Sequence, residues 1–224
     1  MSGMTARECY WKIVNHEEAD RVPILWGGTN SSIVPSHYGK LCDALGIKDY
    51  RPGVGDFGAV NLHPQLKERF HSDVELLLMG LPRRERLDND LIQDRMWGFL
   101  MQDVGGYRTF PDHVAPLRHA KTIADIEAHP IWPDPDDPAY YHGQKEMAEK
   151  LYSTGKIILG EPSYAASPFL IYPWLRGFDQ WMTDPYEHPD LYRHLAQKIV
   201  DYSVVILERW LEIVGQYPRY LLLL

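Results

Sequence analysis

Four short apolar runs, separated by segments with helical signals, constrain the fold of this chain more than any other feature. They span residues 20–26, 73–80, 156–160 and 219–224. A nearly continuous apolar run of this length is typical of a strand that is buried on both faces, as in a parallel sheet or a barrel. Buried strands that alternate with helices predict a parallel sheet covered by helices.

Helical start and stop signals fill the intervals between these runs. Thr122 is placed as an N-cap, Pro64 and Pro189 fit first helical turns, and Gly46 suits a C-cap. We expect shorter helices over residues 4–16, 36–46, 64–71, 122–129, 139–153 and 168–184. A long amphipathic helix should run from Pro189 to Gly215, with an apolar face formed by Leu191, Leu195, Ile199, Tyr202, Ile206, Trp210 and Ile213.

Two further segments have distinct local signals. Residues 95–110 predict a β-hairpin, because Gly105-Gly106 is a turn signal flanked by apolar residues. Residues 130–138 contain four prolines, which exclude a regular helix or a central strand. We expect this proline-rich segment to be an ordered surface connection.

The expected fold is α/β, of the (β/α)8 TIM-barrel family. The chain would form an incomplete barrel with about four of eight strands, because a complete barrel has about 250 residues or more. We expect a single domain over residues 1–224 that is truncated at its C-terminus. An open doubly wound sheet is the alternative, but no glycine-rich nucleotide fingerprint or P-loop follows any of the runs.

Composition excludes several classes of protein. The chain has 31 acidic and 23 basic residues and a net charge of -8, which disfavours nucleic-acid binding. Its two cysteines match no metal or redox spacing, and so few thiols indicate a reducing compartment. We see no apolar stretch of about 18 residues and no signal peptide, so we expect a cytoplasmic protein without a membrane partner.

Several segments, taken in order, resemble one enzyme superfamily. Ala6-Arg7-Glu8 and residues 15–24 are similar to its amino-terminal signature, and Gly160-Glu161-Pro162-Ser163 is similar to its Gly-x-Pro turn after a central strand. Residues 132–138 (WPDPDDP) and 174–179 (WLRGFD) resemble two further motifs. The superfamily is that of uroporphyrinogen decarboxylase and the corrinoid methyltransferases, and the resemblance runs over nearly the whole chain.

The resemblance implies a (β/α)8 barrel with its active site at the carboxyl ends of the strands. It also implies either decarboxylation of a porphyrinogen without a cofactor, as in porphyrin biosynthesis, or methyl transfer to or from a corrinoid or a thiol. The decarboxylases carry an Arg-Gln-Ala-Gly-Arg stretch after the first strand and a Ser-Asp pair after the second. Here those places read 26–32 (WGGTNSS) and 78–82 (LMGLP), without arginine or acid. A substrate with eight carboxylates would lack its charge-assisted partners, so the methyltransferase-like branch is favoured.

Two alternatives stay open beside that branch. One is a genuine uroporphyrinogen decarboxylase, a carboxy-lyase, and the other is a non-catalytic half-barrel that pairs with another chain. The resemblance implies zinc and a corrinoid for the full-length protein, with zinc ligands in the second half of the barrel. Cys9 and Cys42 do not stand at those ligand positions, so we expect no cofactor within this chain and no activity of the fragment alone. The expected partners are a small-molecule or corrinoid-protein substrate and, as one option, a second copy in a homodimer.

Candidate site residues follow the predicted strands. Glu161 is the candidate catalytic residue, as a general base or a substrate-orienting carboxylate, and its structural alternative is an acid that caps the next helix. Arg176 could grip a carboxylate or phosphate, and its alternative is an ion pair with Asp179 or Asp184. No metal-binding residue is assigned. The candidate substrate-binding residues are Gly27, Gly28, Thr29, Asn30, Ser31, Ser163, Tyr164, Trp174 and Arg176.

Overall fold

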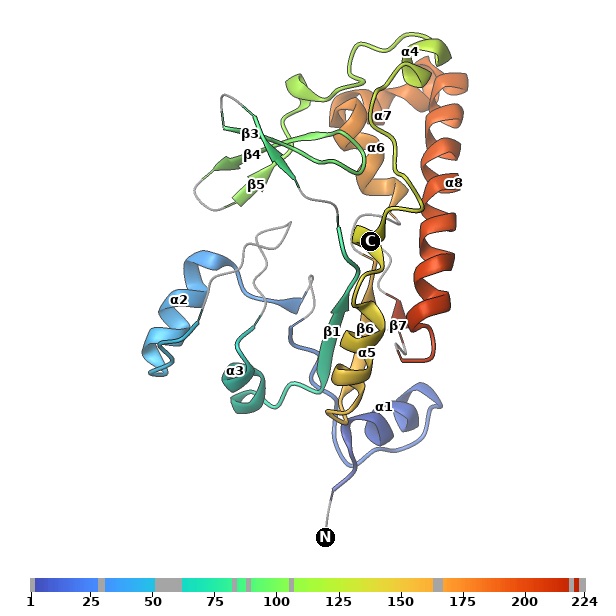
Figure 1. Ribbon diagram of the computed structural model, residues 1–224. Helices are drawn as coiled ribbons and strands as arrows, with labels where there is room; N and C mark the ends of the chain where they lie inside the picture. The colour runs from blue at the N-terminus through green and yellow to red at the C-terminus, as the bar shows by residue number, and fades with distance from the viewer. Residues whose placement is uncertain are drawn as a thin grey trace.

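The structure is a computed structural model that describes residues 3–27, 31–50, 62–81, 84–87, 90–104, 107–162, 167–217 and 220–221. These residues form a mixed α/β structure with one parallel and one antiparallel sheet (Figure 1). Among the described residues the strands do not close into a barrel.

The parallel sheet contains β1 (Val74–Leu78), β6 (Ile157–Glu161) and β7 (Tyr220–Leu221), in the order β1-β6-β7. Three of the four apolar runs therefore contain strands, and these lie side by side in sequence order, as predicted. β1 pairs with β6 from Val74 opposite Ile157 to Leu78 opposite Glu161. The central strand β6 is more deeply buried than β1, with Ile157 and Ile158 fully enclosed.

The prediction of a strand over residues 20–26 is wrong. This segment forms no strand, and Val22, Ile24 and Leu25 are 80%, 44% and 45% exposed. Side chains of other elements bind its backbone instead. The Ile24 N–H donates to Asp73 Oδ2, the Ser72 hydroxyl donates to the Trp26 carbonyl, and the Cys9 thiol donates to the Arg21 carbonyl. One backbone bond, from Asp73 N–H to the Ile24 carbonyl, still attaches the segment to the start of β1.

Asp73 is the anchor of this junction, and its carboxylate also accepts two bonds from Arg21, at 2.6 and 2.7 Å. Replacing it in Asp73→Asn should lower the free energy of unfolding at pH 7 by about 1–3 kcal/mol. Burial raises the pKa of the Asp73 carboxyl, but the bonds from Arg21 and Ile24 outweigh burial and hold the pKa below its ordinary value.

The pH dependence of this effect has a defined sign. The pKa of the Asp73 carboxyl in the folded state lies below its unfolded-state value of about 3.9. The stabilisation from this carboxylate is therefore complete above the unfolded-state pKa, and it is lost as pH falls through the folded-state pKa. Urea unfolding across pH should therefore show the wild-type and Asp73→Asn curves converging in acid. Asp201→Asn, on the exposed side of the last long helix, is the control and should shift stability by no more than about 0.5 kcal/mol. A gap that stays constant into acid would contradict the role of the carboxylate.

The antiparallel sheet contains β2 (Glu85–Arg86), β3 (Leu91–Gln93), β4 (Leu100–Val104) and β5 (Tyr107–Thr109), paired in sequence order. The predicted hairpin over residues 95–110 is confirmed as the β4–β5 pair. Sequence analysis did not identify β2 and β3, because strands of two and three residues are too short to show an alternating pattern.

Every segment expected to be helical contains a helix. The shorter helices are α1 (Ala6–Val14), α2 (Pro35–Ala44), α3 (Pro64–Arg69), α4 (Ile123–Glu127), α5 (Gln144–Tyr152), α6 (Pro168–Arg176) and α7 (Phe178–Glu187). α5 begins five residues later than expected, because Pro138–Tyr140 form a separate 3-10 turn capped by Asp137. The proline-rich segment that precedes this turn forms neither helix nor strand, as predicted.

The long helix α8 (Pro189–Val214) forms one side of the main core and packs against α5, α6 and α7 (Figure 1). Its fully enclosed residues include Leu195, Ile199, Ile206 and Trp210, as the periodicity predicts. Tyr202 and Ile213 are only partly buried, and Val214 and Ser203 occupy enclosed positions instead.

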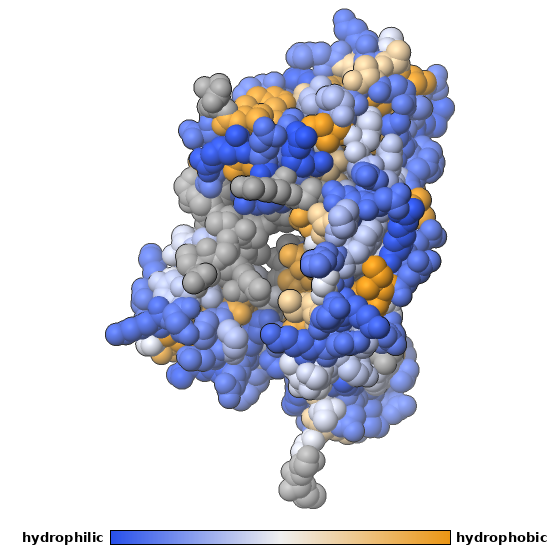
Figure 2. Space-filling view, viewed as in Figure 1, coloured by the Kyte–Doolittle hydropathy of each residue, from blue (hydrophilic) through white to orange (hydrophobic). Residues whose placement is uncertain are grey.

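The face seen in Figure 2 is mostly hydrophilic, with apolar atoms in separate patches. No helix in the described part of the chain is long and apolar enough to cross a membrane.

The segments that carry the family resemblance connect elements of the fold. Arg7 Nε donates to the Lys156 carbonyl at 2.8 Å, which ties α1 to the residue before β6. Glu8 completes a capping box with Thr5 at the start of α1. In the proline-rich segment, Asp136 pairs with Arg209 of α8. These contacts give Arg7, Glu8 and Asp136 structural roles.

Candidate functional site

Glu161 is a buried carboxylate at the carboxyl end of the central parallel strand. Its residue is 2% exposed, and its backbone carbonyl accepts a bond from Met79 N–H at 2.9 Å. The N-cap of the next helix, α6, is Ser167, so Glu161 belongs to the strand and is not the capping residue. A buried carboxylate is costly to maintain, and such groups gather at functional sites. Its position at the carboxyl edge of a parallel sheet is the one at which α/β enzymes place catalytic groups.

Gly27 and Ser31 lie in the segment that follows residues 20–26, and they contact each other. Gly27 has a φ of +124° and donates its N–H to the Ser31 carbonyl at 2.9 Å. A Cβ atom at Gly27 would lie 3.2 Å from Cε of Lys67 in α3. The glycine therefore allows a close approach of the buried Lys67 side chain, whose Nζ pairs with Glu75 at 2.8 Å. Gly28, Thr29 and Asn30 lie outside the described residues, as do Ser163 and Tyr164.

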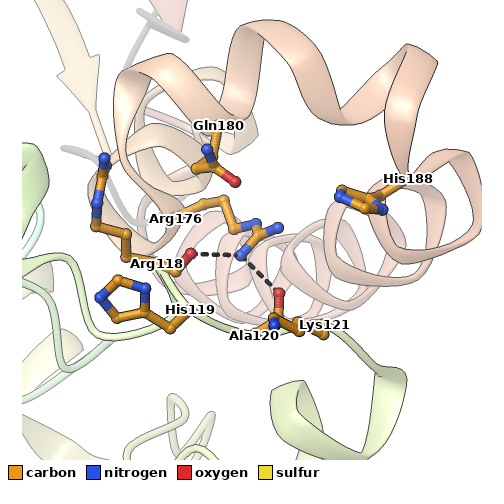
Figure 3. Close-up of a pocket in the computed structure, with 7 residues that line it drawn as sticks. All are labelled: Arg118, His119, Ala120, Lys121, Arg176, Gln180 and His188. Atoms are coloured by element: carbon orange, nitrogen blue, oxygen red, sulfur yellow. Dashed lines mark hydrogen bonds between the residues drawn. The ribbon is translucent and has the colours of Figure 1, made fainter.

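Trp174 and Arg176 are both on α6 but line different pockets. Residues two positions apart on a helix point to nearly opposite sides. Trp174 lines an aromatic pocket of about 240 Å³ with Phe110. Arg176 lines a basic pocket of about 230 Å³ (Figure 3). The two predicted substrate-binding residues are therefore not brought to one site.

Arg176 is held in a buried ion pair. Its Nε and Nη2 donate to the two carboxylate oxygens of Asp184 at 2.7 and 3.0 Å, and the residue is 2% exposed. Its Nη1 donates to the carbonyls of Leu117, Arg118 and Ala120, two of which are drawn in Figure 3. This geometry matches the structural alternative of an Asp184 ion pair, because the guanidinium donors are directed at protein acceptors.

Tyr172 completes the same network. Its hydroxyl donates to Asp184 Oδ2 at 2.9 Å, and the residue is 2% exposed. Burial, followed by this bond to a carboxylate, raises the pKa of Tyr172 far above its ordinary value. Tyr172 therefore stays protonated and acts as a second donor that stabilises the Asp184 charge.

The basic pocket also contains residues that sequence analysis did not identify, namely Arg118, His119, Lys121, Gln180 and His188. Figure 3 shows these side chains around Arg176. Arg118 forms two bonds of 2.7 Å with the carboxylate of Asp179. Both guanidinium groups of the pocket are thus neutralised by aspartates, which weakens its attraction for an anion. The segment that carries Arg118 and Lys121 had no helical or strand signal that could have placed it here.

The cysteines and histidines do not form a zinc site in the part of the chain that the structure describes. No group of three His, Cys, Asp or Glu side chains there could hold a metal ion. Cys9 donates to the Arg21 carbonyl, and burial raises the pKa of the Cys42 thiol, which opposes thiolate formation. His63 caps α3 by accepting a bond from Gln65 N–H. These residues do not fit the zinc chemistry that the family resemblance implies.

Comparison with known proteins adds no further constraint. No family model matches the sequence, and neither the curated proteins nor the solved structures provide a match. The family resemblance therefore stays a prediction.

Proposed function

We propose that the chain is part of a (β/α)8-barrel enzyme of the uroporphyrinogen decarboxylase-like superfamily, in its methyltransferase-like branch. The observation that carries the proposal is Glu161, a carboxylate that is 2% exposed at the carboxyl end of the central parallel strand. The parallel order β1-β6-β7, with helices in the connections, is the arrangement of consecutive barrel strands. The bond from the Asp73 N–H to the Ile24 carbonyl attaches residues 20–26 to the start of β1.

The proposed chemistry is transfer of a methyl group from a corrinoid to a thiol. Glu161 accepts the proton of the thiol substrate, or holds that substrate in position for the transfer. The thiolate sulfur bonds the methyl carbon, and the electron pair of the broken cobalt–carbon bond stays on the cobalt of the corrinoid substrate. A cytoplasmic location agrees with this proposal, since Cys9 and Cys42 are both free thiols.

Uroporphyrinogen decarboxylation is supported less well. That reaction needs cationic partners for many substrate carboxylates. The candidate arginine of the site, Arg176, instead donates to Asp184 and to three backbone carbonyls. Leu78 and Met79, at the end of β1, offer no charge at the carboxyl edge.

The Glu161→Gln variant tests the proposal, because it removes the proton acceptor and preserves the shape of the side chain. The test uses the full-length enzyme of which this chain is proposed to be a part. That enzyme is mixed with methylcobalamin, whose binding is followed by quenching of tryptophan fluorescence, and then with 2-mercaptoethanol, which starts methyl transfer. We expect saturable binding by both proteins and a rate of methyl transfer about 10²-fold lower in the variant. Glu212→Gln, at an exposed position of α8, is the matched control and should leave the rate unchanged.

Three outcomes would overturn the proposal. Equal rates for wild-type and Glu161→Gln protein would remove Glu161 from the chemistry. Formation of coproporphyrinogen from uroporphyrinogen would instead support the decarboxylase. A stable dimer with neither corrinoid binding nor turnover would support the non-catalytic half-barrel.

A further inference from the structure

Five aromatic side chains and one carboxylate line a pocket beside α6 and α7. The residues are Phe110, Phe169, Trp174, Phe178, Trp181 and Asp112, and the pocket has a volume of about 240 Å³. Sequence analysis assigned only Trp174 of this set to substrate binding, because the residues come from three separate stretches of the chain. We call this set the aromatic pocket.

Ring contacts hold the walls of the aromatic pocket in place. Phe110 stacks on Trp174, with centroids 4.1 Å apart and planes within 7°. Phe169 packs edge-on against Trp181 at 4.9 Å. Phe169 and Phe178 are nevertheless 64% and 56% exposed, although rings of this size are normally covered. Exposed apolar surface around a concave site is typical of a place where a ligand binds.

The charge of the aromatic pocket is negative. Asp112 is the ionisable side chain among its lining residues, and its Oδ1 accepts the Phe178 N–H at 2.7 Å. This bond fixes the carboxylate at the rim of the pocket. The neighbouring cation, Arg118, donates from both Nη1 and Nη2 to the carboxylate of Asp179. Arg118 also interacts electrostatically with Asp112, but one cation between two carboxylates leaves the net charge negative.

We propose that the aromatic pocket binds a methylated ammonium ion, such as the trimethylammonium group of a small molecule. The faces of aromatic rings carry negative potential and attract a cation that lies within about 6 Å of the ring centre. A methylated ammonium ion leaves water more readily than a primary ammonium ion and fills an apolar pocket with its methyl groups. The ring walls and Asp112 together favour such a cation and disfavour an anion. The proposal does not use Glu161, so its failure would leave the proposed methyl transfer untouched.

Choline and its neutral isostere 3,3-dimethylbutan-1-ol test the proposal, because they share shape and differ in charge. Binding is followed by the fluorescence of the tryptophans and by ligand-observed NMR on the whole protein. We expect choline to bind at least about tenfold more tightly than the neutral alcohol. Equal affinities, or no saturable binding of choline at millimolar concentration, would overturn the proposal.

Two variants separate the contributions of charge and of aromatic rings. Asp112→Asn should weaken choline binding several-fold and leave binding of the alcohol unchanged. Phe169→Leu keeps an apolar side chain at an exposed position, so it should fold normally and weaken choline binding more than alcohol binding. The matched controls are Asp201→Asn and Tyr186→Leu, at exposed positions outside the aromatic pocket, and neither should alter binding. A loss of choline affinity in the controls equal to that in the pocket variants would show non-specific binding and would also overturn the proposal.

Discussion

Replacing Arg176 with methionine is expected to lower the free energy of unfolding by about 3–5 kcal/mol. The change leaves the buried Asp184 carboxylate with Tyr172 as its donor, and it removes the donor to three backbone carbonyls. A buried charge without its counter-ion carries a large desolvation penalty, which neither water nor the remaining hydroxyl can offset. Urea unfolding followed by far-UV circular dichroism measures the loss.

Two further variants keep this prediction testable if Arg176→Met protein is too unstable to purify. Arg176→Lys retains the charge but loses the planar fork of donors, so it should show a smaller loss than Arg176→Met. The double variant Arg176→Met/Asp184→Leu removes both charges and should recover part of the stability. Arg193→Met is the control, since Arg193 and its partner Asp190 have side chains 72% and 84% exposed. That control should lose less than about 1 kcal/mol, and a similar small loss for Arg176→Met would contradict the importance of the buried pair.

Trp210→Ala is the second substitution with a large expected effect, again a loss of about 3–5 kcal/mol. Trp210 is fully enclosed on α8, and its indole N–H donates to Gln144 Oε1 of α5 at 2.9 Å. The truncation leaves a cavity where α8 packs on α5 and leaves a buried amide oxygen without this donor. Thermal and urea unfolding should both report the loss.

Comparison of Trp210→Phe with Trp210→Ala separates the two causes. Phenylalanine fills most of the space but cannot donate, so we expect a loss of about 1–3 kcal/mol for this variant. Trp11→Ala, at a position 39% exposed on α1, is the control for removing an indole ring and should cost about 1 kcal/mol or less. Equal losses for Trp11→Ala and Trp210→Ala would contradict the assignment of Trp210 to the core.

Local signals predicted most of the secondary structure because they act within a few residues. Thr122 caps α4, and Pro64 begins α3, because caps and first turns depend on neighbouring backbone groups. The apolar repeat of α8 predicted its buried face, since a helix places every third or fourth residue on one side. β2 and β3 were not predicted, because β2 pairs with β3 and β3 pairs with β4, so each depends on a neighbouring strand more than on its own few residues.

The candidate site was predicted in part. Glu161 lies at the carboxyl end of a buried parallel strand, as the apolar run before it indicated. Trp174 lines a pocket, but Arg176 is bound to Asp184, and the two residues face different sides of α6. Neither Asp112 nor Arg118 could be placed from the sequence, because Asp112 begins a three-residue 3-10 helix and Arg118 lies in a turn, and contacts with α7 position both.

The alternation of strands and helices, the ends of most helices and the apolar face of α8 could all be predicted from the amino-acid sequence. Those features follow from periodicity and from local hydrogen bonding, which each short stretch carries within it. Three features became visible in the folded chain alone: residues 20–26 form no strand, Arg176 pairs with Asp184, and five aromatic rings line one pocket with Asp112. Each of these depends on groups from separate stretches of the chain, and packing alone determines which of them satisfies a buried charge or backbone group.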